Sequence, residues 1–251
     1  MRAVFTAILA ALLVTAGVSA AQASTKNLPW STCTPLATRY FGQYRVDDGG
    51  ADGPLCIETT SGHNLIIQSA YHGTGIAYPD IRTGRFYSSR DAASRLPVQV
   101  ADPTWITLGL TDRGSAPGSW LADVDAWFYP THQIHGHGAD ELVIVTRSHD
   151  WGGACPRLLR VSGLLFCADR HLTGSDGLSW PLVVLRLVPE RTRVRIVLGR
   201  VLRSLAAWGW LSRSVWLGSI AYGAELGPGA GRGLRLSMRA YVEGYPMVGP
   251  L

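Results

Sequence analysis

Short apolar runs alternate with clusters of glycine, aspartate, serine and proline along most of the chain. This spacing is typical of an antiparallel all-β protein. We therefore expect strands at residues 40–46, 55–60, 64–70, 96–100, 105–110, 120–129, 140–145, 194–198, 220–227 and 234–242. The aspartate-rich segment 47–53 is predicted to be a solvated turn, because it lacks the later glutamate of a calcium-binding loop.

One segment, residues 199–208, has helical periodicity. Its apolar residues recur at helical spacing, at Val201, Leu202, Leu205 and Trp208. Gly209 stands where a left-handed residue often ends a helix, and Arg200 and Arg203 fall on the polar side. A basic amphipathic helix can lie on a membrane, but we expect the commoner use of this pattern, which is packing across the outside of a sheet.

The first 23 residues have the pattern of a secretory signal peptide. Arg2 precedes an apolar run over residues 3–17, and small residues around Ala23 suit cleavage. We expect residues 24–251 to form a single extracellular domain. Stable membrane insertion is not expected, because neither this run nor any later segment is long enough for a comfortable span. An uncleaved anchor is the alternative.

The composition favours a folded globular chain over a disordered one, since 47% of the 251 residues are hydrophobic and 16% are charged. The formal net charge of +5 makes the chain mildly basic, which bears on solubility. We expect a monomer with no nucleic-acid partner.

Four cysteines follow the signal segment, as suits export to an oxidising compartment. Three pairings are possible, and we prefer Cys33 with Cys56 and Cys155 with Cys167, since each closes a loop of the size that joins neighbouring strands. Zinc is not expected, because no two cysteines lie two to four residues apart. Three histidines in one loop are possible ligands for a transition metal, but a polar loop needs no metal to explain them: His132, His135 and His137. We expect no metal and no cofactor.

Glu141 interrupts an apolar strand pattern. In an extended chain Glu141, Val143 and Val145 share one face, while Leu142 and Ile144 share the other. A glutamate among β-branched residues costs free energy unless it has hydrogen-bond partners or a task. The alternative is a half-solvated glutamate at the strand's entrance.

The strand at residues 120–129 carries polar and aromatic side chains on one face, namely Leu121, Asp123, Asp125 and Trp127. A flat ring beside hydrogen-bond acceptors suits a sugar-binding groove, although an ordinary solvent-facing strand is the alternative.

Glu225 is a second glutamate among small and apolar residues, with a water-facing strand end as its alternative explanation. The glycine-rich segment 227–233 that follows is expected to be a hairpin turn. A phosphate-binding loop is rejected, because no helix pattern follows it.

Residues 33–243 resemble glycoside hydrolase family 12, the secreted β-1,4-glucanases and xyloglucanases. The resemblance is distributed over Cys33, Cys56, Tyr44-Arg45-Val46, Gln68-Ser69, Ala77-Tyr78-Pro79-Asp80-Ile81, Leu96-Pro97-Val98, Val124-Asp125-Ala126-Trp127-Phe128, Glu141-Leu142-Val143-Ile144, Gly152-Gly153, Pro156, Ala207-Trp208-Gly209-Trp210-Leu211 and Gly223-Ala224-Glu225. It implies a β-jelly roll sandwich of two antiparallel sheets, with a concave substrate cleft and one helix on the outer face.

The resemblance also implies the roles of three carboxyl groups. Glu141 would be the nucleophile, Glu225 the general acid/base and Asp125 the carboxylate beside the nucleophile. A retaining glycosidase needs two carboxyl groups about 5–5.5 Å apart, one ionised and one protonated. The group in the drier setting takes the proton, which favours Glu225 as the acid. The expected activity is endo-acting hydrolysis of cellulose, xyloglucan or a related β-linked polysaccharide.

The sequence departs from the family's pattern in the cleft. The family usually has methionine and tryptophan where this chain has Val143 and Val145, which we count with Asp123 and Trp127 as substrate-binding positions. It also places a tryptophan in the 47–53 loop and a cysteine pair near residues 85–89, and both are absent here. Weaker glucan binding follows unless other tryptophans compensate, and the candidates are Trp105, Trp151 and Trp180.

Two other classes of protein stay open. A jelly-roll protein that binds polysaccharide without cutting it would give saturable binding and no new reducing ends. An interaction protein at the cell surface would depend on Arg200 and Arg203 instead.

Overall fold

The computed structural model describes residues 29–50, 52–86, 94–101, 106–136, 138–151, 153–175, 178–242 and 245–246. The first of its two sheets contains, in spatial order, β1 (Trp30–Thr32), β4 (Ile57–Thr59), β5 (Asn64–Ile67), β16 (Arg235–Val242), β8 (Ile106–Arg113) and β14 (Arg193–Val197), with β17 (Tyr245–Pro246) paired to β16. The predicted signal peptide lies outside the described residues.

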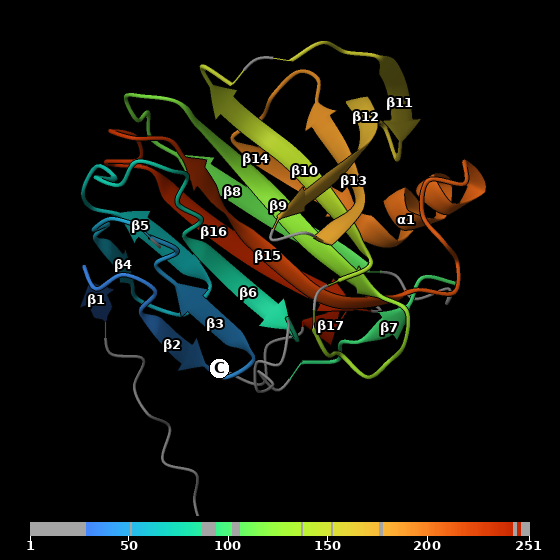
Figure 1. The fold of residues 1–251 in the computed structure, drawn as a ribbon, viewed down its shortest axis with the longest axis horizontal. Helices are drawn as coiled ribbons and strands as arrows, with labels where there is room; N and C mark the ends of the chain where they lie inside the picture. Colours follow the sequence, from blue (N-terminus) through green and yellow to red (C-terminus); the bar gives the residue numbers. More distant parts are fainter. Residues whose placement is uncertain are drawn as a thin grey trace, which may run out of the picture.

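The second sheet is larger. Its strands, in spatial order, are β11 (Arg157–Val161), β12 (Leu164–Ser175), β13 (Leu178–Leu187), β10 (Asp140–His149), β9 (Trp120–Tyr129), β15 (Trp216–Leu226), β6 (Asp80–Gly84), β3 (Tyr44–Asp47) and β2 (Thr38–Phe41), with β7 (Val98–Gln99) paired to β15. Figure 1 shows the strands of both sheets running across the molecule. The predicted β-jelly roll is confirmed, with one difference: β10 and β13 pair in parallel.

The core lies between the sheets because alternate residues of each strand are apolar. In β9 the inward row is Trp120, Ala122, Val124, Ala126 and Phe128, and all five are buried. Leu142 and Ile144 of β10 join the same cluster, as do Leu108 and Leu110 of β8. The other row of each strand therefore faces away from the core, and on the second sheet that row carries the predicted site residues.

The single helix among the described residues is α1 (Leu198–Ala207), close to the predicted 199–208. Its apolar side joins the main core, and it contacts β8 and β11 at one side of the sandwich (Figure 1). Gly209 has the expected left-handed φ of +71°. Trp208 was predicted on the apolar face but follows the helix and is 38% exposed, with the Arg157 guanidinium 5.5 Å from its ring centre. No helix of the described chain is long and apolar enough to cross a membrane.

Three local predictions were wrong. The strand predicted at 40–46 is divided into β2 and β3, because Gly42 (φ +59°) turns the chain back on itself. The segment 47–53 is not simply solvated, since Asp47 and Asp48 are buried. The Asp48 carboxylate accepts backbone N–H bonds from Leu36 (2.7 Å) and Gly50 (3.1 Å).

The third concerns residues 227–233. They do not close a hairpin within one sheet, because β15 before them and β16 after them belong to different sheets.

Asp112 is the one carboxylate in the inward row of β8, and it ties the two sheets together. Arg147 of β10 donates to Asp112 Oδ1 at 2.6 Å, and the Tyr222 hydroxyl of β15 lies 3.5 Å from Oδ2. Asp112 is 1% exposed. The ion pair therefore spans the interior of the sandwich and fixes β10 and β15, which carry the two glutamates.

We predict that Asp112→Ala lowers the free energy of unfolding by about 3–5 kcal/mol, because it leaves a partly buried guanidinium unpaired. Denaturant unfolding measures this. The exposed Arg160→Ala is the control and is expected to change stability by less than about 0.5 kcal/mol. An Asp112→Ala protein as stable as the wild type would contradict the structural role of this pair.

Candidate active site

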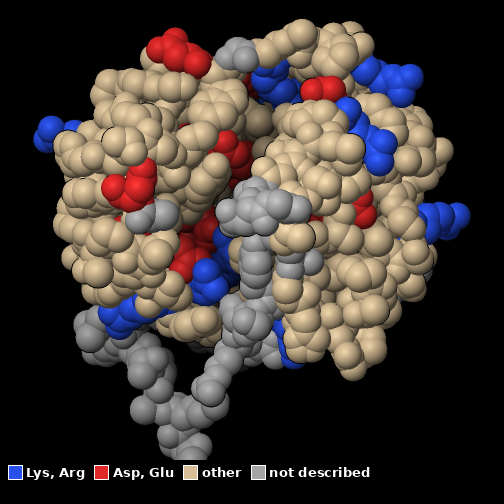
Figure 2. Space-filling model, viewed as in Figure 1, with Lys and Arg blue, Asp and Glu red and all other residues tan. Residues whose placement is uncertain are grey.

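A cleft of about 560 Å³ lies on the face of the second sheet that points away from the core. Five carboxyl groups line it, from Asp80, Asp123, Asp125, Glu141 and Glu225. Arg82 is the only cation among the described residues around it. Figure 2 shows acidic side chains in a hollow of this face, while the surface around the hollow carries scattered acidic and basic side chains.

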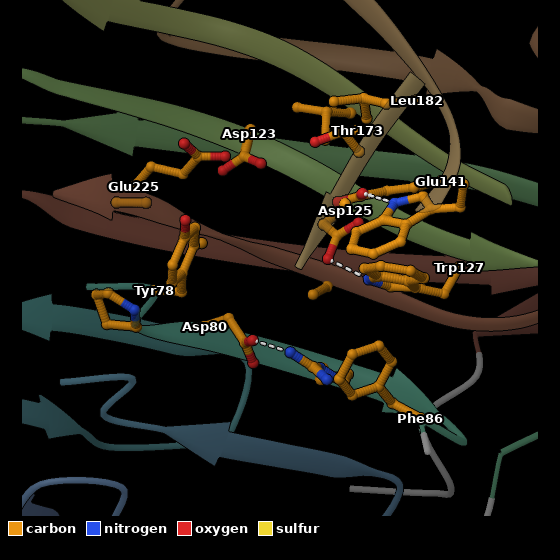
Figure 3. A pocket seen from close by; sticks show the side chains of 18 residues that line it. Tyr78, Asp80, Phe86, Asp123, Asp125, Trp127, Glu141, Thr173, Leu182 and Glu225 are labelled. Atoms are coloured by element: carbon orange, nitrogen blue, oxygen red, sulfur yellow. Dashed lines mark hydrogen bonds and ion pairs between the residues drawn. The ribbon is translucent and has the colours of Figure 1, made fainter. Parts of the chain in front are cut away.

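Strand register brings the acidic residues together. On one side of β9, Glu141 of β10 is paired with Trp127, and Val143 with Asp125. On the other side, Gly223 of β15 is paired with Asp123, and Glu225 follows two residues later on the same face. Glu141 and Glu225 therefore flank the acidic row of β9 from opposite strands, and Figure 3 shows both side chains lining the same space.

Glu141 is oriented by a tryptophan from β13. The indole N–H of Trp180 donates to Glu141 Oε2 at 2.6 Å (Figure 3). The Trp180 ring packs against Trp127, with ring centres 5.5 Å apart. Glu141 is the second residue of β10 and is partly exposed, as expected for a half-solvated glutamate at the strand's entrance. Its side chain nevertheless lines the cleft, and the Trp180 indole fixes its carboxylate.

Asp125 lies beside Glu141 on the same face. The Trp127 indole donates to Asp125 Oδ2 at 2.7 Å, while Oδ1 is buried with no hydrogen-bond partner among the described residues. Burial raises the pKa of Asp125 well above its usual value, and the charge of Glu141 adds to that shift. An ionised Glu141 thus favours a protonated Asp125, which can donate a hydrogen bond.

Glu225 is held in its protonated form at mildly acidic pH. Burial, followed by the charge of Glu141, raises the pKa of Glu225 to about 7. Figure 3 shows its carboxyl group turned toward Asp123, which is 6% exposed. Burial also raises the pKa of Asp123, with Glu225 as the next cause. Two adjacent carboxyl groups in a dry site retain a proton to higher pH than either would in water.

Glycine at position 223 makes room for this arrangement. A Cβ there would lie 2.5 Å from the Pro79 carbonyl oxygen and 2.9 Å from the Asp80 Cβ. The absence of a side chain lets β6 pack against β15 while the space beside Asp123 stays open. Any larger residue at position 223 would push β6 away from β15 or fill the space beside Asp123.

Residues of β6 and the segments around it form the other wall. Asp80 and Arg82 are paired, and the Arg82 guanidinium lies 4.2 Å from the ring centre of Phe86. Burial raises the pKa of Asp80 to about 6. Tyr78 stands at the rim, where burial and then the charge of Glu225 raise its pKa to about 12, so its hydroxyl stays neutral. A neutral phenol near Glu225 is available as a hydrogen-bond donor.

The cleft continues past Glu225 into a second compartment of about 400 Å³. The two share Val143, Leu182 and Glu225. The second compartment has an aliphatic floor, formed by Leu121, Val143, Val145, Leu182 and Val184, with Trp151 beside it.

Every residue predicted for the site is placed on this face. Asp123, Asp125, Trp127, Glu141, Val143 and Glu225 line the first compartment, and Val145 lines the second. Of the three tryptophans considered as replacements, Trp180 and Trp151 line the cleft, and Trp105 lies outside the described residues.

The sequence analysis missed the wall formed by Tyr78, Asp80, Arg82 and Phe86, and it predicted no strands between residues 157 and 187. The alternation of Val183, Leu185 and Leu187 with Leu182, Val184 and Arg186 was the available signal for β13.

The predicted cysteine pairs and the predicted histidine loop are not part of the acidic compartment, although Cys167 lines the second compartment. Both preferred disulfides are present, Cys33–Cys56 and Cys155–Cys167. The His132 ring lies 5.7 Å from that of Trp216, and His137 is outside the described residues. In the described part of the chain, no three His, Cys, Asp or Glu side chains are grouped for a metal ion.

Solved structures share this fold. A metagenome-derived glycoside hydrolase family 12 endoglucanase is 25% identical, with a TM-score of 0.75 over 85% of this chain and 97% of its own. Endoglucanase Cel12A from Rhodothermus marinus gives the same identity, TM-score and coverage of this chain, and 98% of its own. A family 12 xyloglucanase from Bacillus licheniformis is 19% identical, with a TM-score of 0.75 over 85% of this chain and 99% of its own. No family model and no curated protein matches the sequence.

The fold is therefore of the glycoside hydrolase type. The predicted resemblance is confirmed in the fold, which is that of these glycoside hydrolase family 12 enzymes at low sequence identity.

We predict that Glu141→Gln lowers the pKa of Glu225, because it removes the negative charge that opposes ionisation. Carbon-13 NMR of the glutamate side-chain carboxyl carbons measures this directly, since the chain has only Glu58, Glu141, Glu190, Glu225 and Glu243. The wild-type Glu225 should titrate near pH 7 and hold its proton below that pH.

The exposed Glu190→Gln serves as the control and should leave the midpoint unchanged. An unshifted Glu225 midpoint in Glu141→Gln would show that the two groups do not interact.

Proposed function

We propose that the protein is a secreted, retaining endo-β-1,4-glucanase-like hydrolase that acts on cellulose, xyloglucan or a related β-glucan. One observation carries the proposal: Glu141 and Glu225 line one cleft from opposite strands, and the charge of Glu141 helps to keep Glu225 protonated. That pairing of an ionised and a protonated carboxyl group is what double displacement requires. The endoglucanases and xyloglucanases with the same fold support the substrate class.

The first step uses both glutamates. The Glu141 carboxylate attacks the anomeric carbon and forms a glycosyl ester, while Glu225 gives its proton to the departing glycosidic oxygen. The hydrogen bond from Trp180 to Glu141 Oε2 fixes the orientation of the carboxylate for this attack. Asp125, protonated beside Glu141, is placed to donate a hydrogen bond to the nucleophile or to a sugar hydroxyl.

The second step reverses the proton transfer. Once Glu141 is esterified its charge is lost, so the pKa of Glu225 falls and the ionised group can act as a base. Glu225 then takes a proton from the water that attacks the anomeric carbon, and the ester bond to Glu141 breaks. The product keeps its anomeric configuration. No cofactor takes part, and we propose that the enzyme works outside the cell as a monomer.

The shape of the cleft suits a polymer. Its two compartments are continuous through Glu225, so a chain can extend beyond the point of cleavage on the leaving-group side. Trp127, Trp180 and Phe86 offer aromatic surfaces to the sugar rings in the first compartment.

A polysaccharide-binding protein without hydrolytic activity is the second candidate. The observation that favours it is the aliphatic floor of the second compartment, where Val143 and Val145 give no aromatic plate for a sugar ring. If the second compartment binds the leaving-group sugars weakly, turnover is reduced, whereas glycan binding in the first compartment is affected less.

We predict that the wild type releases reducing ends from soluble β-glucan or xyloglucan, and that Glu141→Gln and Glu225→Gln each lose at least about a hundredfold in kcat. Glu141→Gly should recover turnover with azide, which replaces the missing nucleophile. Glu190→Gln is the matched control with wild-type activity. Saturable glycan binding without reducing ends, unchanged in both variants, would establish the binding protein instead.

We also predict that Trp180→Phe lowers kcat about tenfold or more, with a smaller change in KM. The substitution keeps an aromatic side chain, although a smaller one, and removes the indole N–H that orients Glu141; a hydrogen bond to a charged group is worth about 1.5–3 kcal/mol. Trp208→Phe, on a partly exposed tryptophan next to α1, is the control. An unchanged kcat in Trp180→Phe would rule out the orienting role.

A further inference from the structure

The outer face of the first sheet carries a trough of about 870 Å³ that runs along β8. Its floor is low because Gly109 has no side chain and is flanked on the same strand by Thr107 and Thr111. The apolar residues between them, Leu108 and Leu110, point into the core. The trough therefore lies on the side of the sandwich away from the acidic cleft.

Arginines stand on both sides of this floor. In the strand register Gly109 is paired with Arg195 of β14 on one side and with Arg239 of β16 on the other. Arg193 lies on β14, on the same side of the trough as Arg195. At the end of β8, Arg113 is paired in the strand register with Arg235 of β16. All five arginines are exposed, no described carboxylate forms an ion pair with them, and no acidic residue lines the trough.

The spacing fits a linear polymer with repeated negative charges. Alternate residues of a strand are about 6.6 Å apart, and walls two strands apart are separated by about 9.6 Å. A chain lying along β8 would thus meet guanidinium groups on both sides. Guanidinium groups bind carboxylates with paired, charge-assisted hydrogen bonds.

The remaining lining favours a polysaccharide over a nucleic acid. Hydroxyl groups of Thr107, Thr111 and Ser237 face the trough and can bond to sugar hydroxyls. Tyr241 is its only described aromatic residue, so one sugar ring can pack there, whereas a nucleic-acid groove uses a series of rings for base stacking.

We propose that this trough binds a linear, carboxylate-bearing polysaccharide, a polyuronate, and that it does so independently of the cleft. The neutral chain in the cleft and the anionic chain in the trough would then be held on opposite faces of one domain. Binding in the trough would keep the protein on a polysaccharide matrix that contains both kinds of polymer.

The test is calorimetric titration of the full chain with a galacturonate hexamer at low ionic strength. The wild type should bind, with affinity that falls steeply as salt is added. The double variant Arg195→Gln/Arg239→Gln should lose at least tenfold in affinity. Arg160→Gln, an exposed arginine on β11, should bind as the wild type does.

A second variant separates shape from charge. Gly109→Val fills the floor without altering the net charge, and a Cβ at Gly109 meets only ordinary contacts at 3.8 and 3.9 Å from Arg239. It should also reduce binding tenfold or more. The hydrolysis of a short, soluble, neutral glucan should be the same in all these variants, so trough and cleft are tested separately.

Three results would overturn the proposal. The first is no binding of the hexamer to the wild type at low salt. The second is binding that survives both the arginine and the glycine variants. The third is equal or tighter binding of single-stranded oligothymidylate with the same dependence on Arg195 and Arg239, which would assign the trough to nucleic acid.

Discussion

Repulsion among carboxyl groups in a dry cleft is the constraint on which the site depends. Asp80, Asp123, Asp125, Glu141 and Glu225 line one compartment in which Arg82 is the only cation among the described lining residues, so they cannot all be ionised together at low cost. Burial is the first cause that raises the pKa of Asp80, Asp123, Asp125 and Glu225, and neighbouring carboxylates add to each shift, so these groups keep their protons to higher pH. A rigid apolar sandwich must lie beneath them, because a flexible face would let the carboxyl groups move apart and reduce these shifts.

The sandwich provides that rigidity by a simple rule of alternation. Each strand of the second sheet places one row in the core and the other in the cleft, and the Arg147–Asp112 pair joins the two sheets at the strands that carry the glutamates. The same rule gives the first sheet an outer row rich in arginine. One fold thereby presents an acidic surface on one face and a basic surface on the other, although the net charge is only +5.

Much of this face could be predicted from sequence because alternation is local. The strand at residues 120–129 was predicted with its observed bounds, and the rows containing Asp125 and Glu141 were assigned to the correct side. The pairing of strands is not local. The Trp180 contact with Glu141 depends on β13 lying beside β10. This pairing is parallel, and no turn motif in the sequence predicts it.

Two other features, the Asp80–Arg82 pair and the course of the chain after Glu225, were not predicted for the same reason. The role of Asp80 and Arg82 depends on β6 lying beside β15, which is distant in sequence. The glycine segment after Glu225 has the composition of a hairpin, but the chain uses it to pass from one sheet to the other. Composition identifies a turn, whereas the destination of the next strand is set by packing.

Covalent trapping tests the central claim, that Glu141 is the nucleophile opposite Glu225, most directly. A 2-deoxy-2-fluoro β-cellobioside with a dinitrophenyl leaving group should form a stable ester, because the fluorine slows the second step more than the activated first step. Mass spectrometry of the digested protein should find one added disaccharide, on the peptide that contains Glu141. An adduct on another carboxyl group, or inversion of configuration in the hydrolysis product, would contradict the account.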